Sequence, residues 1–62
     1  MTIPEIILDI TKSFHVKLID NNSISVIASY MSQLEIIAKH YKIELLRTHS
    51  NEFTITGIFK LS

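Results

Sequence analysis

The stretch from Ser23 to Tyr41 constrains the fold most, because it runs for 19 residues without a Gly, Pro, Asn or Asp. Placed at about 100° per residue, its apolar side chains fall within one arc of roughly 160° and its polar side chains fill the opposite arc. Among the large apolar residues, Ile36 alone lies on the polar side. This pattern predicts one long amphipathic helix over about residues 23–41.

A competing interpretation divides the same stretch into the helix-turn-helix of a winged-helix DNA-binding protein. That motif needs a turn that reorients the second helix by about 90–120°. The apolar phase continues through Met31, Ser32 and Gln33, and no residue typical of turns stands there. We therefore favour a core helix. Its outward face is a candidate partner surface, formed by Ser32, Gln33, Ile36, Lys39 and His40.

The N-terminal segment predicts a short helix followed by a strand. Thr2 and Glu5 have the spacing of a capping box, and Pro4 falls in the first helical turn, where its missing N–H costs nothing. Residues 14–19 alternate apolar and polar side chains, as expected of a strand with one buried face. The sequence DNNS at 20–23 supplies turn residues, and Asn22 or Ser23 is an N-cap candidate for the long helix.

The C-terminal third predicts a β-hairpin. A three-residue loop at 49–51 pairs Leu45 with Ile55 and Arg47 with Phe53, whereas a loop at 50–52 sets Leu45 opposite Gly57. Both registers keep the same side chains on the same face, so both stay open.

These elements predict a single α+β domain in the order α-β-α-β-β. The expected sheet has three strands, with the C-terminal hairpin packed on the long helix and a parallel crossover from the first strand through that helix to the second. A chain of 62 residues buries only about 60% of its unfolded surface. Because it has no Cys for disulfides, oligomerisation is the remaining common source of stability.

No pattern in the sequence points to an enzyme, a cofactor or a metal site. The histidines, at 15, 40 and 49, lack the i, i+4 spacing of a helical zinc pair, and one Gly cannot form a phosphate loop. Glu5 and Asp9 are interpreted as solvated carboxylates that favour the helix dipole. Without a signal sequence or an apolar run of about 20 residues, we expect a soluble, cytoplasmic chain with no membrane partner.

The outer face of the expected sheet is the main candidate site. It carries Ile19, Leu46 and Ile58 among polar residues, and three large aliphatic side chains need cover. Either the isoleucines of the N-terminal helix lie over them, or this face binds a second copy of the chain or another protein.

The leading hypothesis is a non-enzymatic protein-interaction or regulatory module, acting as a homodimer or on a protein partner. The small size of the chain and its lack of catalytic, cofactor-binding or metal-binding motifs suggest an accessory or inhibitor protein of the kind that viruses and mobile elements encode. The alternative is a winged-helix-like DNA-binding protein, with contacts from Lys39, Lys42, Arg47 and Lys60. Zero net charge disfavours nucleic acid, because binding to it depends largely on neutralising phosphates.

Overall fold

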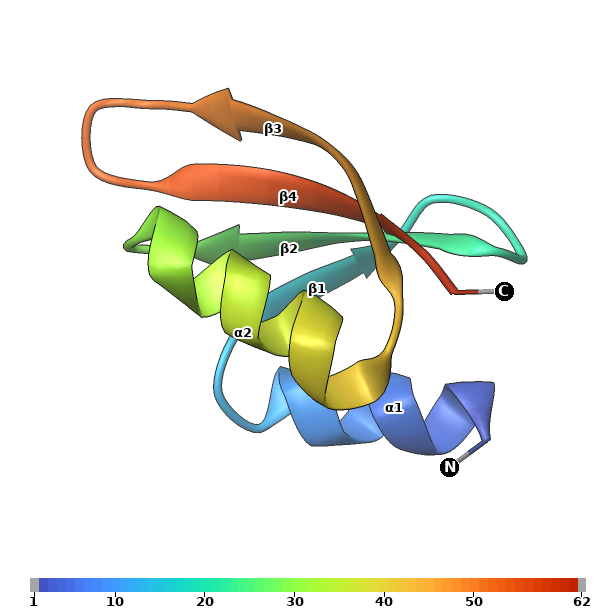
Figure 1. Ribbon diagram of the computed structural model, residues 1–62. Helices are drawn as coiled ribbons and strands as arrows, with labels where there is room; N and C mark the ends of the chain where they lie inside the picture. The colour runs from blue at the N-terminus through green and yellow to red at the C-terminus, as the bar shows by residue number, and fades with distance from the viewer. Residues whose placement is uncertain (1, 62) are drawn as a thin grey trace.

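The computed structural model describes residues 2–61, in which two helices and four strands form an α+β fold. In chain order these are α1 (Ile3–Thr11), β1 (His15–Leu18), β2 (Ser23–Ala28), α2 (Met31–Tyr41), β3 (Glu44–Ser50) and β4 (Ile55–Lys60). The strands form one sheet in the order β1-β2-β4-β3, and every neighbouring pair is antiparallel (Figure 1). Within this part of the chain, neither helix is long and apolar enough to cross a membrane.

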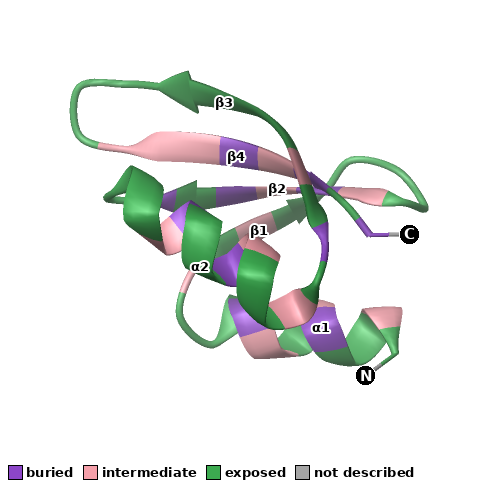
Figure 2. Cartoon of the chain, viewed as in Figure 1, coloured by how far each residue is buried: buried purple, intermediate pink, exposed green. Residues whose placement is uncertain are grey.

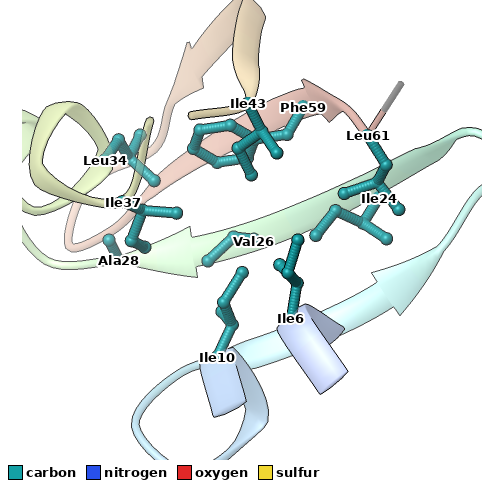
Figure 3. Packing of buried hydrophobic residues seen from close by; sticks show 10 residues of the cluster. All are labelled: Ile6, Ile10, Ile24, Val26, Ala28, Leu34, Ile37, Ile43, Phe59 and Leu61. Carbon is teal, nitrogen blue, oxygen red and sulfur yellow. The ribbon is translucent and has the colours of Figure 1, made fainter. Parts of the chain in front are cut away.

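Both helices lie on the same face of the sheet, which we call the inner face (Figure 1). The buried positions of the helices and of the central strands face each other (Figure 2), and Figure 3 shows Ile6 and Ile10 of α1 directed at Ile24 and Val26 of β2. The buried core consists of Ile6, Ile10, Ile24, Val26, Ala28, Leu34, Ile37, Ile43, Phe59 and Leu61.

The prediction of one helix over 23–41 is wrong, because its first six residues form strand β2. Ile24, Val26 and Ala28 are buried on the inner face, whereas Ile27 is exposed. Periodicity over so few residues does not distinguish a strand from a helix in a short apolar run. Pairing decides the outcome, since β2 lies between β1 and β4 and hydrogen-bonds to both.

Helix α2 starts at Met31, and Gln33 helps to define that start. The Gln33 Oε1 accepts hydrogen bonds from the backbone N–H groups of Ser29 (2.9 Å) and Tyr30 (3.0 Å). Tyr30, the N-cap, has extended backbone angles. This contact is the glutamine half of a capping box, and it separates strand from helix without a Gly or Pro.

The predicted element order and three-stranded sheet are also wrong, because β2 adds a strand. Residues 14–19 do contain a strand, and DNNS does form a turn, in which the Asp20 Oδ1 accepts the Asn22 N–H at 2.8 Å. This turn joins β1 to β2 as a hairpin and caps no helix. The parallel crossover instead runs from β2 through α2 to β3, with β4 inserted between these two strands and antiparallel to both.

The C-terminal hairpin exists, but in neither predicted register. Ser50 pairs with Ile55, and the Asn51 N–H donates to the Thr54 carbonyl at 2.7 Å across the connection. An unbroken strand would then set Leu45 opposite Lys60, whereas Leu45 lies opposite Phe59. The register shifts between Leu45 and Arg47, which marks a β-bulge. In an unbroken strand these two side chains would point to the same face of the sheet, but the bulge turns them to opposite faces.

Helix α1 begins as predicted and packs on the inner face of the sheet. Its capping box is present, with the Glu5 Oε1 accepting the Thr2 N–H at 3.1 Å. However, Ile6 and Ile10 enter the core on the inner face, so of the two alternatives for the outer face, cover by α1 is wrong. The 11 residues of α2 extend only about 16 Å, and α1 supplies the remaining cover beside it.

Candidate interaction face

The face of the sheet opposite the helices, which we call the outer face, is the candidate functional site. Directly paired residues of antiparallel strands point to the same side, so the three registers identify its members. These are His15, Lys17, Ser23, Ser25, Ile27, Glu44, Arg47, His49, Thr56, Ile58 and Lys60. Both helices lie on the other side, which leaves this face uncovered within residues 2–61 (Figure 1).

Aliphatic side chains form a diagonal stripe across the outer face. Ile27 on β2 is 41% exposed, and Leu46 at the β3 bulge is 46% exposed. Ile58 on β4 lies between them in strand order and is partly exposed. Next to the stripe, Ile19 follows the end of β1 and is 50% exposed.

The structure brings the three predicted outer-face residues into one hollow. Ile19, Leu46 and Ile58 all line a depression of about 460 Å³, with Arg47 and Asp20 at its margin. The β3 bulge contributes to this arrangement, because Leu46 is the extra residue between the inward Leu45 and the outward Arg47. The alternation in the sequence thus predicted side chains that line the same hollow, although the elements around them were predicted incorrectly.

Basic side chains flank the stripe on both edges of the sheet. One row of paired residues reads Lys17, Ser25, Ile58, Arg47, and the next reads His15, Ile27, Thr56, His49. Neither row contains a carboxylate. Glu44 lies opposite Lys60 at one end of the face, and the Asp20 carboxylate already accepts a backbone hydrogen bond.

The predicted helix surface divides among three environments. Ser32, Ile36 and Lys39 line one groove of about 500 Å³ on the outside of α2, and Ile36 is 64% exposed there. Gln33 is engaged in capping. His40 lies towards α1, with its ring 4.7 Å from that of Tyr41, centroid to centroid, in an edge-on arrangement.

The four candidate nucleic-acid contacts do not form one patch. Lys39 lies on α2, and Lys42 directly follows that helix, whereas Arg47 and Lys60 point to the outer face of the sheet. The described residues also contain no helix-turn-helix, because a strand pair separates α1 from α2. The winged-helix architecture is therefore wrong.

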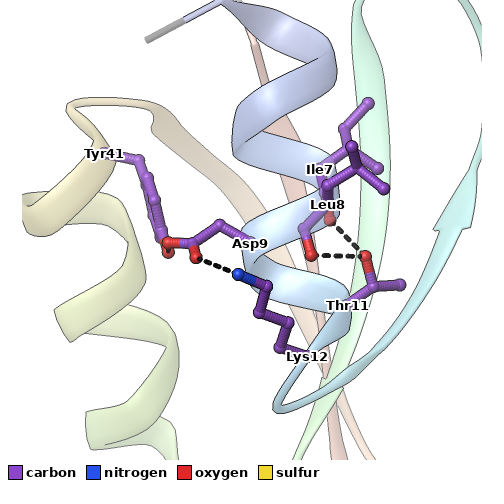
Figure 4. Close-up of polar contacts among 6 residues, drawn as sticks. All are labelled: Ile7, Leu8, Asp9, Thr11, Lys12 and Tyr41. Atoms are coloured by element: carbon purple, nitrogen blue, oxygen red, sulfur yellow. Dashed lines mark hydrogen bonds and ion pairs between the residues drawn. The ribbon is translucent and has the colours of Figure 1, made fainter.

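Polar contacts between the helices form a separate, smaller cluster. The Tyr41 hydroxyl donates to the Asp9 carboxylate, and the Lys12 Nζ lies 3.7 Å from the other Asp9 oxygen (Figure 4). The Tyr41 hydrogen bond and, less strongly, Lys12 lower the pKa of Asp9, while the same bond raises the pKa of Tyr41. Within residues 2–61, no three His, Asp or Glu side chains are placed to share a metal ion.

Ile27 is the member of the stripe that sequence reasoning missed. The predicted helix over residues 23–41 places Ile27 on its buried arc, on the same side as Ile24. The signal that identifies it is the alternation in SISVIA, whose β-branched residues also favour a strand.

The chain matches no protein-family model, no curated protein and no solved structure in the comparisons made.

Proposed function

We propose that this chain is a non-enzymatic protein-interaction module that binds its partner through the outer face of the sheet. The observation that carries the proposal is the aliphatic stripe of Ile27, Ile58 and Leu46 on a face that neither helix covers. Contiguous apolar surface rimmed by polar residues is typical of protein interfaces.

Burial of these aliphatic side chains would contribute favourable free energy to binding. Fully burying one aliphatic side chain contributes roughly 1.5–3 kcal/mol. Ile27 and Leu46 are already about half buried, so each would contribute roughly 1 kcal/mol on the same basis. The flanking polar side chains would supply orientation, as in the rim of other interfaces.

A selection from random twelve-residue peptides displayed on phage tests the proposal. We expect peptides that bind the wild-type chain and lose binding to the double variant Ile27→Ser/Ile58→Ser. The matched control is Ile36→Ser, which makes the same change on the exposed side of α2 and should leave binding intact. Circular dichroism establishes that each variant is folded.

Light scattering tests whether a second copy of the chain is the partner. A dimer that becomes monomeric in the double variant would support the homodimer hypothesis. Peptides that depend on Ile36 instead would move the interface to the helix. A monomer that selects no peptide dependent on the outer face would contradict the proposal.

A further inference from the structure

We infer that the outer face binds a protein segment that presents aliphatic side chains flanked by carboxylates. This inference rests on the proposed function and specifies the partner. Its basis is the charge on the two edges of the face, where Lys17 and Arg47 stand on either side of Ile58 and Ser25 in one row.

These two cations are available to a partner. Neither Lys17 nor Arg47 forms an ion pair within residues 2–61, and both side chains are exposed. The wider face carries Lys17, Arg47 and Lys60 against Glu44 and, in the adjoining hollow, Asp20, which is a formal charge of +1 on a chain whose net charge is zero. The asymmetry places the surplus positive charge around the aliphatic stripe.

The histidines at the ends of the next row add hydrogen-bond donors. His15 lies beside Ile27, and His49 beside Thr56. An imidazole carries at least one N–H whether it is neutral or protonated, so each can donate to a carboxylate. Arg47 offers a planar pair of donors that matches a carboxylate in two-point contact.

A second copy fits this face poorly. A twofold dimer places the same patch on both sides of the interface. When the twofold axis passes through the row that contains Lys17 and Arg47, this row meets the same two cations, and no carboxylate in the row balances them. Like charges across an interface cost several kcal/mol, so the pattern favours an acidic partner.

Single-stranded nucleic acid fits less well than an acidic peptide. Proteins that bind single strands stack the bases on aromatic side chains in the binding groove. The outer face has no Phe, Tyr or Trp among its members, and the exposed Tyr30 and Phe53 lie in the connections beyond the strand ends. Aliphatic side chains between two cations are better suited to a peptide.

The size of the face sets the length of the segment. Four strands at about 4.8 Å spacing span roughly 14 Å. About five residues of extended chain or ten of helix cross that width. The twelve-residue library described above therefore covers either conformation.

The composition and charge dependence of the selected peptides test the inference. We expect the peptides to contain more Asp and Glu than Lys and Arg, with aliphatic residues between them. The double variant Lys17→Glu/Arg47→Glu should weaken their binding by about tenfold or more, the effect expected of losing two rim cations. Lys39→Glu, the matched change on α2, should stay within twofold, and Gln in place of the acidic peptide residues should mimic the double variant.

The alternative outcomes separate this inference from the proposed function. Peptides that need Ile27 and Ile58 but show no acidic excess would overturn the inference and leave an interaction module. Failure to select any peptide that depends on the outer face would overturn both. If a twelve-nucleotide oligo-dT binds more tightly than the best peptide and depends on Lys17 and Arg47, the partner is a nucleic acid and the inference is wrong.

Discussion

At the scale of single residues, Lys42 has the one left-handed backbone conformation recorded in the described chain. Its φ of 56° and ψ of 45° end helix α2, and its N–H donates to the Ala38 carbonyl. A side chain with a Cβ pays roughly 1–2 kcal/mol for this conformation, whereas glycine adopts it freely. This helix end could not be predicted from its residue type, because a lysine and not a glycine stands at the position.

Replacing Lys42 by Gly should stabilise the protein. We expect the free energy of unfolding to rise by about 1 kcal/mol, since the relief of backbone strain exceeds the added entropy of the unfolded chain. Urea titration followed by circular dichroism measures the change. Lys39→Gly, inside the same helix, is the control and should lower stability by about 1 kcal/mol. A loss of stability in both variants would contradict the assigned helix end.

Gly57 lies where the side chain of Leu34 on α2 packs tightly against the sheet. A Cβ built there would lie 3.0 Å from both methyl groups of Leu34 and 3.1 Å from the Leu45 Cδ1. Gly57→Ala should therefore lower stability by about 1–3 kcal/mol through overpacking, despite the better strand propensity of alanine. Thermal and urea unfolding measure it. In a Leu34→Ala background the cost should shrink, and an unchanged cost would point to a backbone cause.

At the scale of elements, β2 offers a direct comparison between a strand and the helix expected from sequence. Ile24 is fully buried on the inner face, and Ile27, three residues later, is 41% exposed on the outer face. Ile24→Ala should cost about 2–5 kcal/mol, whereas Ile27→Ala should cost no more than about 1 kcal/mol. A helix with both residues on its buried arc would lose similar stability in the two variants. Urea titration of the pair distinguishes these cases.

The start of α2 depends on the side chain of Gln33. Gln33→Ala removes two hydrogen bonds to backbone N–H groups and should cost about 1 kcal/mol. Gln33→Glu should retain stability, because a carboxylate accepts the same bonds and favours the positive end of the helix dipole. Ser32→Ala is the neighbouring control. Equal stability of the Gln33 variants in urea titration would argue against the capping role.

Local signals predicted some elements correctly, and tertiary contacts decided the others. The Thr2–Glu5 capping box, the strand after Phe14 and the DNNS turn all have short-range causes, and each is present. Strand β2 needs partners on both sides, β1 and β4, which no short-range pattern displays. The β3 bulge likewise arises from strand pairing. The predicted hairpin registers assumed unbroken alternation along β3, and the bulge is one reason that they are wrong.

At the scale of the whole molecule, both helices lie in one layer on the inner face of the sheet. This arrangement was not predicted, and for that reason only part of the candidate outer face was predicted from the sequence. Alternation indicated that Ile19, Leu46 and Ile58 point away from the core, and they do line one hollow. The position of α1 could not be predicted without the fourth strand. A four-stranded sheet has an inner face too wide for α2 alone, so α1 packs beside α2 on that face. Because strand β2 was not predicted, the outward position of Ile27 and the placement of Lys17 in the same row as Ile58 were not predicted either.

The contact between Tyr41 and Asp9 joins the two helices of that layer and makes the fold sensitive to pH. Because the Tyr41 hydroxyl and Lys12 lower the pKa of Asp9 in the folded state, the unfolded chain binds a proton more readily in acid. The stabilisation is complete above the ordinary Asp pKa, near 3.8, and decreases as pH falls towards the folded value. The pKa of Tyr41 is raised above 10.0 in the folded state. The contribution of Tyr41 to folding stability is therefore present below that pH and decreases above it.

Tyr41→Phe keeps the ring and removes the donor, so it isolates this contact. We expect the wild-type chain to have a higher Tm than the variant between about pH 5 and 9, with the difference shrinking on both the acid and the alkaline side. Glu5, whose pKa is lowered by its hydrogen bonds to Thr2, contributes equally to both proteins and cancels in the difference. Tyr30→Phe is the matched control, because the Tyr30 side chain is 67% exposed and lies away from Asp9 at the other end of α2. Melting curves from pH 2 to 11 test this dependence, and a difference that stays constant across that range would show that Asp9 and Tyr41 do not interact in solution.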